Sequence, residues 1–357
     1  MDKMTHVKFN LNSFLMAFSV ALDNTVDKNK NGIKYNSKRV AYSCLRLINY
    51  FDFDPSYFSD IFSYSIVCKN KITKKNLKRI PFNNTSIYYN ARINNILTLA
   101  KFIEDNIDIK DYLVINKKEL INLVLTNKDL NDEVKENFKD LSSDMTYWLD
   151  MINEPQLPFY IYNFLQDFTF ECDYEVLIDL SRLINEVVYD YRDNKNKVDI
   201  DKKCKMMCEV YNFDNKDISR MMISINLYNI GSLFIPKEIL LKDSKLSDGE
   251  YDLIKSIPYY SAYIISQIFG FDDISKTCSM YAEKLDGSGY PYELEASSLS
   301  LKNRLISALI VYQALLENRT YRQGYSSDDA IGILEEASKK GELDIAVVES
   351  IISKFKD

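Results

Sequence analysis

Tyr281–Pro291 reads YAEKLDGSGYP, and this stretch decides how the rest of the 357-residue chain is interpreted. Gly287 and Gly289 are separated by a single residue, and they permit a tight turn because glycine reaches positive φ without steric cost. The Tyr290-Pro291 pair stiffens the exit, since proline fixes its own φ and drives the preceding residue toward extended conformations. The stretch therefore predicts a sharply turned loop with helices on both sides.

The composition of the whole chain indicates a helical globular protein. Hydrophobic residues make up 46% and charged residues 27%, the ordinary balance of a folded domain. The chain has only 9 glycines and 7 prolines, too few for a fold rich in turns between strands. We therefore predict an all-α fold.

Charge and cysteine content limit the compartment and the partners. The net charge is -7, with acidic and basic residues interspersed, which disfavours nucleic acid because such binding needs a concentrated basic face. No apolar run approaches the roughly 18 residues of a membrane span, and the N-terminus has no signal-peptide core. We predict a cytoplasmic protein without a membrane segment, whose six cysteines are reduced thiols.

Apolar residues recur with helical period through both halves of the chain. Ser247-Asp248-Gly249-Glu250 reads as a capping box. We found no convincing pair of alternating strands. The helices are expected at about residues 11–26, 37–51, 55–68, 90–105, 117–126, 131–141, 174–192, 200–212, 216–230, 258–269, 272–284, 298–317, 327–339 and 343–355. The expected domains are residues 1–142 and 171–357, joined by a connecting segment at 143–170.

From about residue 223 to 322, the second half resembles the HD-GYP family of bacterial metal-dependent phosphodiesterases, which open cyclic di-GMP. Leu227–Ser232 reads LYNIGS where the family has Leu-His-Asp-Ile-Gly-Lys. Ile235–Leu240 and Ile254–Pro258 also follow the family pattern, and Tyr281–Lys284 stands for His-His-Glu-Arg. Asp286–Pro291 is the intact family loop. The resemblance implies an all-α fold of two tandem HD-like helical domains, the second of them HD-GYP-like.

The resemblance also implies a metal centre whose ligands are missing. Such a centre holds its cations with imidazoles and carboxylates and activates a water to attack a phosphodiester. The chain has one histidine, His6, far from the motif. We therefore expect no metal and no cofactor, and a catalytically inactive relative rather than an enzyme; the competing hypothesis is an active phosphodiesterase with a non-standard metal site. The degenerate ligand positions are Asn196, Tyr228, Asn229, Ile257, Tyr281, Ala282 and Leu309.

In the first half, Asn36-Ser37-Lys38-Arg39-Val40 lies where HD-domain proteins place a histidine before an arginine-valine pair. This resemblance favours a diverged HD-like domain at residues 1–142. A generic helical module is the alternative.

Several polar groups have both a functional and a structural interpretation. Glu283 and Asp286 could serve as an acid/base pair, or Glu283 could make a structural hydrogen bond while Asp286 caps the loop. Cys204 and Cys208 have the i, i+4 spacing of metal ligands, but buried core thiols are the simpler interpretation.

Four cations near the motif and one basic run leave further alternatives open. The four cations could hold phosphate or have structural roles: Lys242, Lys245, Arg319 and Arg322. The basic run from Lys69 to Arg79 is interpreted as a solvated loop and not as a nucleic-acid contact.

For function, the sequence favours a regulatory or protein-interaction module in cyclic-dinucleotide signalling. The family loop has been linked to partner proteins, so we expect a protein partner at Asp286, Gly287, Ser288, Gly289, Tyr290 and Pro291. An alternative is a sensor that binds cyclic di-GMP without hydrolysis and holds its phosphates with Lys245, Arg319 and Arg322. A homodimer is also left open.

Overall fold

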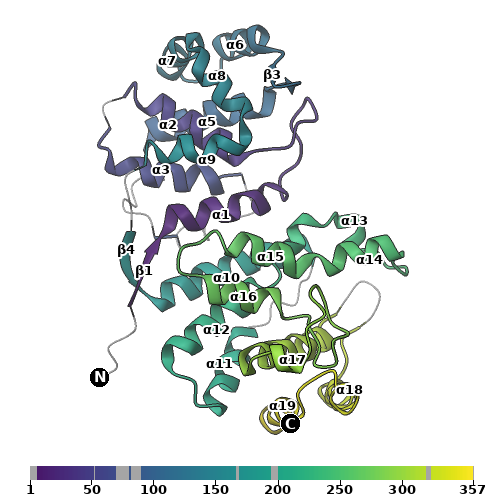
Figure 1. Ribbon diagram of the computed structural model, residues 1–357. Coiled ribbons are helices and arrows are strands. Elements are labelled where there is room, and N and C mark those ends of the chain that lie inside the picture. The colour runs from purple at the N-terminus through teal and green to yellow at the C-terminus, as the bar shows by residue number, and fades with distance from the viewer. Residues whose placement is uncertain are drawn as a thin grey trace. The chain divides into compact units, whose positions relative to one another are not determined.

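The computed structural model describes residues 6–51, 53–69, 80–81, 90–165, 169–193, 200–318 and 323–356. Helices dominate these residues, and the prediction of an all-α fold is confirmed (Figure 1). The expectation of no strand pair is wrong. Strand β1 (His6–Asn10) pairs with β4 (Thr169–Asp173), and β2 (Ile109–Lys110) pairs antiparallel with β3 (Leu113–Val114). Strands of two to five residues are too short to show a clear alternation.

The chain divides into two compact units. The N-terminal unit comprises residues 10–170, and the C-terminal unit comprises residues 171–357 together with the first nine residues, which carry most of strand β1. The domain boundaries and the diverged HD-like character of the first half remain predictions.

The N-terminal unit is built around helix α2, which packs against α3, α5 and α9. Eleven of the twelve residues of α2 are buried. Asn36 caps this helix, because its side-chain oxygen accepts hydrogen bonds from the backbone N–H groups of Lys38 and Arg39. The helices of this unit are α1 (Leu11–Asp23), α2 (Ser37–Ile48), α3 (Ser56–Val67), α5 (Ala91–Asn106), α6 (Lys117–Thr126), α7 (Asp132–Ser143), α8 (Met145–Ile152), η2 (Glu154–Gln156) and α9 (Leu157–Tyr162).

The segment at residues 143–170 contributes to the core of this unit. Trp148, in α8, is buried, and its indole N–H donates a hydrogen bond of 2.9 Å to the carbonyl of Ser142. The indole packs edge-on against Tyr147 and Phe138. The single tryptophan of the chain therefore reports on the folding of the N-terminal unit.

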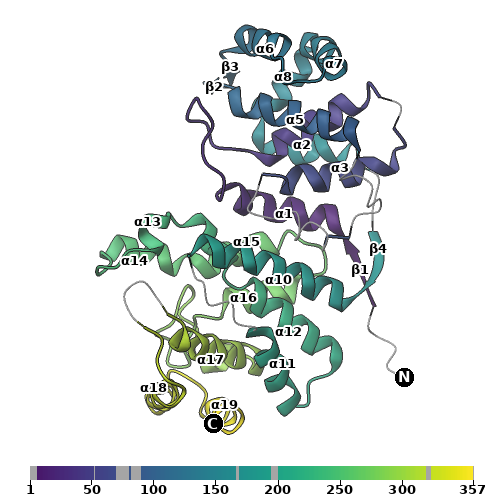
Figure 2. The same ribbon diagram turned by 180° about the vertical axis from the view of Figure 1, so that it is seen from behind.

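The C-terminal unit is organised around helix α12, which packs against α10, α11 and α16 (Figures 1 and 2). The helix is buried along most of its length, from Ile218 to Leu227. The helices of this unit are α10 (Tyr174–Tyr191), α11 (Ile200–Val210), α12 (Asn215–Leu227), η3 (Ile230–Phe234), α13 (Lys237–Leu240), α14 (Asp248–Lys255), α15 (Ile257–Ile265), α16 (Asp272–Ser279), η4 (Ala296–Ser298), α17 (Leu301–Leu316), α18 (Ser327–Lys339) and α19 (Ile345–Phe355).

Capping residues set the starts of two of these helices. The predicted capping box at Ser247 is confirmed, because the Ser247 hydroxyl accepts from the backbone of Glu250 and the Glu250 carboxylate accepts from the backbone of Ser247. Ser300 and Asn303 form a second box, which places the start of α17 at Leu301, three residues later than we predicted.

Candidate functional site

The glycine loop of the C-terminal unit is closed by the carboxylate of Glu283. This side chain is only 2% exposed. Its Oε1 accepts a hydrogen bond of 2.7 Å from the backbone N–H of Tyr292, and its Oε2 accepts one of 2.9 Å from that of Leu294. Both oxygens are engaged by the far side of the loop, so the side chain fits the structural interpretation and not the acid/base one.

The two glycines have separate reasons to be glycine. Gly287 has a φ of +79°, in the left-handed region. At Gly289, a Cβ atom would lie 2.3 Å from the backbone nitrogen of Lys284 and 2.4 Å from the Cα of Glu283, so only hydrogen fits. The exit of the loop is fixed by the backbone N–H of Tyr290, which donates to the carbonyl of Ala282 at 3.2 Å.

Asp286 organises the outer turn of the loop. Its Oδ1 accepts hydrogen bonds from the backbone N–H of Ser288 at 3.0 Å and from the Ser288 hydroxyl at 2.8 Å. These bonds lower the pKa of the Asp286 carboxyl. Because Asp286 and Glu283 both bond within the loop, the loop is a fixed turn and not a catalytic dyad.

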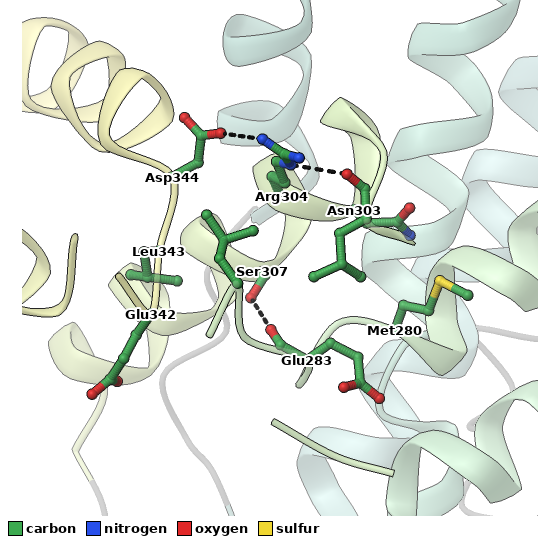
Figure 3. Close-up of a pocket in the computed structure, with 10 residues that line it drawn as sticks. Met280, Glu283, Asn303, Arg304, Ser307, Glu342, Leu343 and Asp344 are labelled. Carbon is green, nitrogen blue, oxygen red and sulfur yellow. Dashed lines mark hydrogen bonds and ion pairs between the residues drawn. The ribbon is translucent and has the colours of Figure 1, made fainter. Parts of the chain in front are cut away.

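A small pocket behind the loop is structural. Its volume is about 10 Å³, room for about one water molecule. Figure 3 shows Arg304 joined to Asp344, a pair separated by 2.9 Å, and the Ser307 hydroxyl directed at the Glu283 carbonyl at 3.4 Å. The Arg304 guanidinium also donates to two backbone carbonyls. Its charge is already used, so we assign this pocket to the support of the loop.

The degenerate ligand positions lie at the ends of helices and in α17. Tyr228 follows α12 directly, and Tyr281 and Ala282 come two and three residues after the end of α16. The structure brings the rings of Tyr228 and Tyr281 together edge-to-face, with centroids 4.8 Å apart. The remaining described positions are buried: Asn229 (7% exposed), Ile257 (5%) and Leu309 (1%).

Gly231 holds helix α15 close to η3 and so sets the position of Ile257. A Cβ atom at Gly231 would lie 2.2 Å from the Ile257 carbonyl oxygen. The Ser261 hydroxyl joins the two elements, since it accepts from the Gly231 N–H at 2.9 Å and donates to the Tyr228 carbonyl at 2.6 Å. The backbone framework around the ligand positions is thus tightly held, although the side chains have changed.

These side chains do not fit the metal centre of the family. Two phenols, one amide and three apolar groups offer no imidazole and no carboxylate. Burial raises the pKa of the Tyr281 phenol, with Tyr290 adding to the rise, so this phenol is neutral. In the part of the chain that the structure describes, no three His, Cys, Asp or Glu side chains gather as metal ligands would. We derive no metal-dependent step at this position.

Two residues that the sequence analysis missed, Tyr189 and Arg192, adjoin these positions from the end of α10. The Tyr189 hydroxyl donates to Glu317 at 3.1 Å, and Gln313 donates to the same carboxylate oxygen at 3.1 Å. Burial raises the pKa of Tyr189, with further contributions from Tyr228 and Glu317. The sequence Tyr-Asp-Tyr-Arg at 189–192, directly before a charged stretch, is the signal that could have identified these two residues.

Arg192 is the C-cap residue of α10 and comes three residues after Tyr189, a spacing at which side chains are neighbours along a helix. Its positive charge opposes the rise in the pKa of both Tyr189 and Tyr281. We call Tyr189, Tyr228, Tyr281 and Tyr290 the tyrosine cluster. Each member is partly exposed. The cluster therefore presents aromatic surface and one cation at the position where the family holds its metals.

The predicted phosphate-binding cations are distributed differently. Lys245 is exposed between α13 and α14. Lys242 is paired with Glu250 at 2.7 Å, which is a structural role. Arg319, Arg322 and Asn196 lie outside the described residues, and so does most of the basic run that ends at Arg79.

Cys204 and Cys208 are both buried in α11.

In the N-terminal unit, Asn36 lies beside a buried group of charges. The guanidinium of Arg39 donates to both oxygens of Glu104, at 2.7 and 2.6 Å, and the backbone N–H of Asn36 donates to the same carboxylate at 2.9 Å. Asp23 accepts from the Ser37 N–H, and burial raises its pKa to about 7. Arg39, Glu104 and Asp23 are all at most 4% exposed, so this group is sealed from solvent.

Comparison with known proteins places the C-terminal unit in a family. Residues 178–347 match the HD domain family. A 3'3'-cGAMP-specific phosphodiesterase of Vibrio cholerae is 34% identical over 126 residues, which are 35% of this chain and 29% of that protein. A cyclic di-GMP phosphodiesterase of Vibrio cholerae is 34% identical over 137 residues (36% and 28%), and one of Borreliella burgdorferi is 33% identical over 128 residues (36% and 33%). The chain spans about a third or less of the length of these curated relatives.

A solved structure resembles the chain along nearly its whole length. The crystal structure of a cyclic GMP-AMP specific phosphodiesterase of Vibrio cholerae covers 97% of this chain and 98% of its own, with a TM-score of 0.55. The sequence identity is 12%, so this likeness is one of fold.

These findings correct one expectation. We expected a protein that is not an enzyme, and this expectation is wrong. The curated relatives named above are phosphodiesterases, and they point to an enzyme. Along the described ranges, none of the helices has both the length and the apolar character that crossing a membrane requires. Residues 178–347 of the chain match the HD domain family, and the chain shows homology to cyclic di-GMP and cGAMP phosphodiesterases of the HD-GYP type.

Proposed function

We propose that the C-terminal unit binds a cyclic dinucleotide and acts in cyclic-dinucleotide signalling. The relatives are phosphodiesterases of cyclic di-GMP and 3'3'-cGAMP, which supports a ligand of this class. The observation that carries the proposal is the tightly held backbone framework around partly exposed tyrosines. Glu283 holds the loop and the Gly231 contact holds α15, while Tyr228 and Tyr281 are partly exposed.

Isothermal titration of the full chain with cyclic di-GMP and with 3'3'-cGAMP tests this proposal. We expect saturable binding of at least one of them, and linear GMP dimer serves as the control ligand. Absence of binding to both cyclic dinucleotides at millimolar concentration would overturn the proposal.

A second candidate function is a phosphodiesterase whose metal site is built from other residues. It is tested by whether the bound cyclic nucleotide is hydrolysed. The identity to curated phosphodiesterases favours it. Chromatography of the nucleotide after incubation with the protein and added Mn²⁺ or Fe²⁺ would reveal a linear dinucleotide product. Recovery of intact cyclic nucleotide alone would count against this candidate.

A protein partner at the loop Asp286–Pro291 remains a further proposal. The loop is fixed by Glu283, and Ser288 is exposed while Tyr290 is half-buried, so a rigid surface is presented. Pull-down from the native organism should lose a specific partner on Tyr290→Ala and keep it on Tyr259→Ala, a change at an exposed tyrosine of α15. Equal capture by both variants would remove the loop from the interaction.

A further inference from the structure

The tyrosine cluster has the chemistry of a purine-binding surface. Cyclic dinucleotides carry two purine bases and two phosphates, so a site for them needs flat apolar faces and a cation. The cluster offers both within one unit, from the end of α10, the end of α12 and the segment after α16. We propose that the ring of Tyr281 stacks on a purine base of the ligand, that Tyr228 braces this ring edge-to-face, and that Arg192 binds the adjacent phosphate; this inference rests on the proposed function.

The geometry of the tyrosine pair leaves aromatic surface available. Tyr228 and Tyr281 meet at an interplanar angle of 79° with centroids 4.8 Å apart. An edge-to-face pair consumes one face of one ring and one edge of the other, and both residues are partly exposed. Aromatic rings of this kind stack with any base, because every base has a π-face.

Several residues at and beside these positions are ordered by burial and hydrogen bonds. Ile257 and Leu309, two other positions of the family ligand set, are 5% and 1% exposed. Tyr189 donates to Glu317, which also accepts from Gln313, and the Gln313 side chain is 2% exposed and accepts from Lys203 at 3.0 Å. A surface that is already ordered binds with a smaller loss of conformational entropy.

Arg192 supplies a cation that the fold does not otherwise use. Among the residues that the structure describes, no carboxylate lies within ion-pair distance of its guanidinium, whereas Arg39, Arg46, Arg182, Arg220 and Arg304 are all paired. Its neighbours are the neutral phenols of Tyr189 and Tyr281. A guanidinium of this kind suits a phosphate, which it can bind with two parallel hydrogen bonds.

Titration of the full chain and its variants with the better-bound cyclic dinucleotide tests the inference. Tyr281→Ala and Arg192→Gln should each weaken binding by about tenfold or more, the scale of one lost base stack. Tyr263→Ala and Arg92→Gln change an exposed tyrosine and an exposed arginine elsewhere, and should leave the affinity within about twofold.

Two further variants separate stacking from a general structural role. Tyr281→Phe and Tyr281→Trp keep an aromatic ring, so both should retain the wild-type affinity, and circular dichroism confirms that every variant is folded. Wild-type protein should also bind cyclic di-UMP, a pyrimidine analogue, more weakly than the purine ligand. If wild-type protein binds no cyclic dinucleotide, the proposed function fails. If it binds but folded Arg192→Gln and Tyr281→Ala bind equally well, or Tyr281→Phe loses affinity like Tyr281→Ala, this inference alone is overturned.

Discussion

The two units each hold a group of polar side chains, and they use them differently. In the N-terminal unit, Arg39 and Glu104 satisfy each other beneath the cap of α2 and are almost fully buried. In the C-terminal unit, the tyrosine cluster is partly exposed, and Arg192 has no paired carboxylate in the described residues. The Arg39–Glu104 pair is satisfied within the fold, although Oδ1 of the neighbouring Asp23 is buried without a hydrogen-bond partner. The tyrosine cluster differs in its partial exposure to solvent. A polar group is thus informative about function when it is both accessible and incompletely paired.

The largest loss of stability should follow from breaking the buried ion pair of Arg39 and Glu104. Glu104→Gln leaves the buried guanidinium of Arg39 with only the exposed Glu154, 4.0 Å away, as a counter-charge, and we expect the N-terminal unit to lose about 3–5 kcal/mol of unfolding free energy. Urea unfolding followed by the fluorescence of Trp148 measures this unit selectively. Glu133→Gln, at an exposed pair with Arg92, is the control and should cost at most about 1 kcal/mol. Equal losses in both variants would mean that burial of the pair is energetically unimportant.

The next effect concerns the pH dependence of the same unit. Burial raises the pKa of Asp23 from 3.8 to about 7, although Lys38 opposes the rise. Between pH 3.8 and about 7, the folded protein keeps the proton on Asp23 while the unfolded chain loses it. The stability of the fold is therefore highest below pH 3.8 and falls as the pH rises through about 7.

Compared with Asp23→Asn, the wild type should therefore lose about 2–3 kcal/mol of unfolding free energy between about pH 5 and pH 8, at about 1.4 kcal/mol for each pKa unit. Urea unfolding at several pH values, again followed through Trp148, gives the difference directly. Parallel stability curves for the two proteins would show that Asp23 stays ionised in the fold.

Glu283 is a buried carboxylate of the C-terminal unit whose hydrogen-bond partners are backbone groups, whereas Glu104 of the N-terminal unit is also paired with an arginine. Glu283→Gln replaces one acceptor oxygen by a donor that faces a backbone N–H, and we expect a loss of about 2–3 kcal/mol. Thermal unfolding by circular dichroism measures it, with Glu295→Gln, an exposed carboxylate, as the control. An unchanged midpoint would show that the loop is held by its glycines and not by this carboxylate.

The smallest effect tests those glycines. Gly289→Ala places a methyl group against the backbone of Glu283 and Lys284, and should destabilise the C-terminal unit by about 1–3 kcal/mol. Gly249→Ala, in α14 with nothing within 4 Å of the added carbon, should be neutral or stabilising by up to about 1 kcal/mol. Similar melting midpoints for the two variants would contradict the close approach at Gly289.

Local signals predicted much of the fold. Helices α6 and α18 have the predicted ends. The apolar period was sufficient for α6, and at α18 the cap residue Ser326 agrees with the apolar period. The boundary of α17 was misplaced because the box formed by Ser300 and Asn303 was not recognised. The β1–β4 pair was missed because its strands are far apart in the chain, and the β2–β3 pair was missed because each strand has only two residues.

The candidate site was only partly predictable. The family motif located Tyr228 and Tyr281, but their contact with each other and the approach of Tyr189 and Arg192 arise from tertiary packing between distant segments. The expectation of no enzyme was drawn from missing ligands alone, and the identity to phosphodiesterases overturned it.

The pairing of β1 with β4 has a consequence for biosynthesis. The first strand belongs to the C-terminal unit, so the whole N-terminal unit is inserted between this strand and its partner. A ribosome that adds about 5–20 residues per second exposes β1 for on the order of ten seconds or more before β4 emerges. Through that interval the N-terminal unit can complete its fold while the backbone hydrogen-bonding groups of β1 still lack their partner strand.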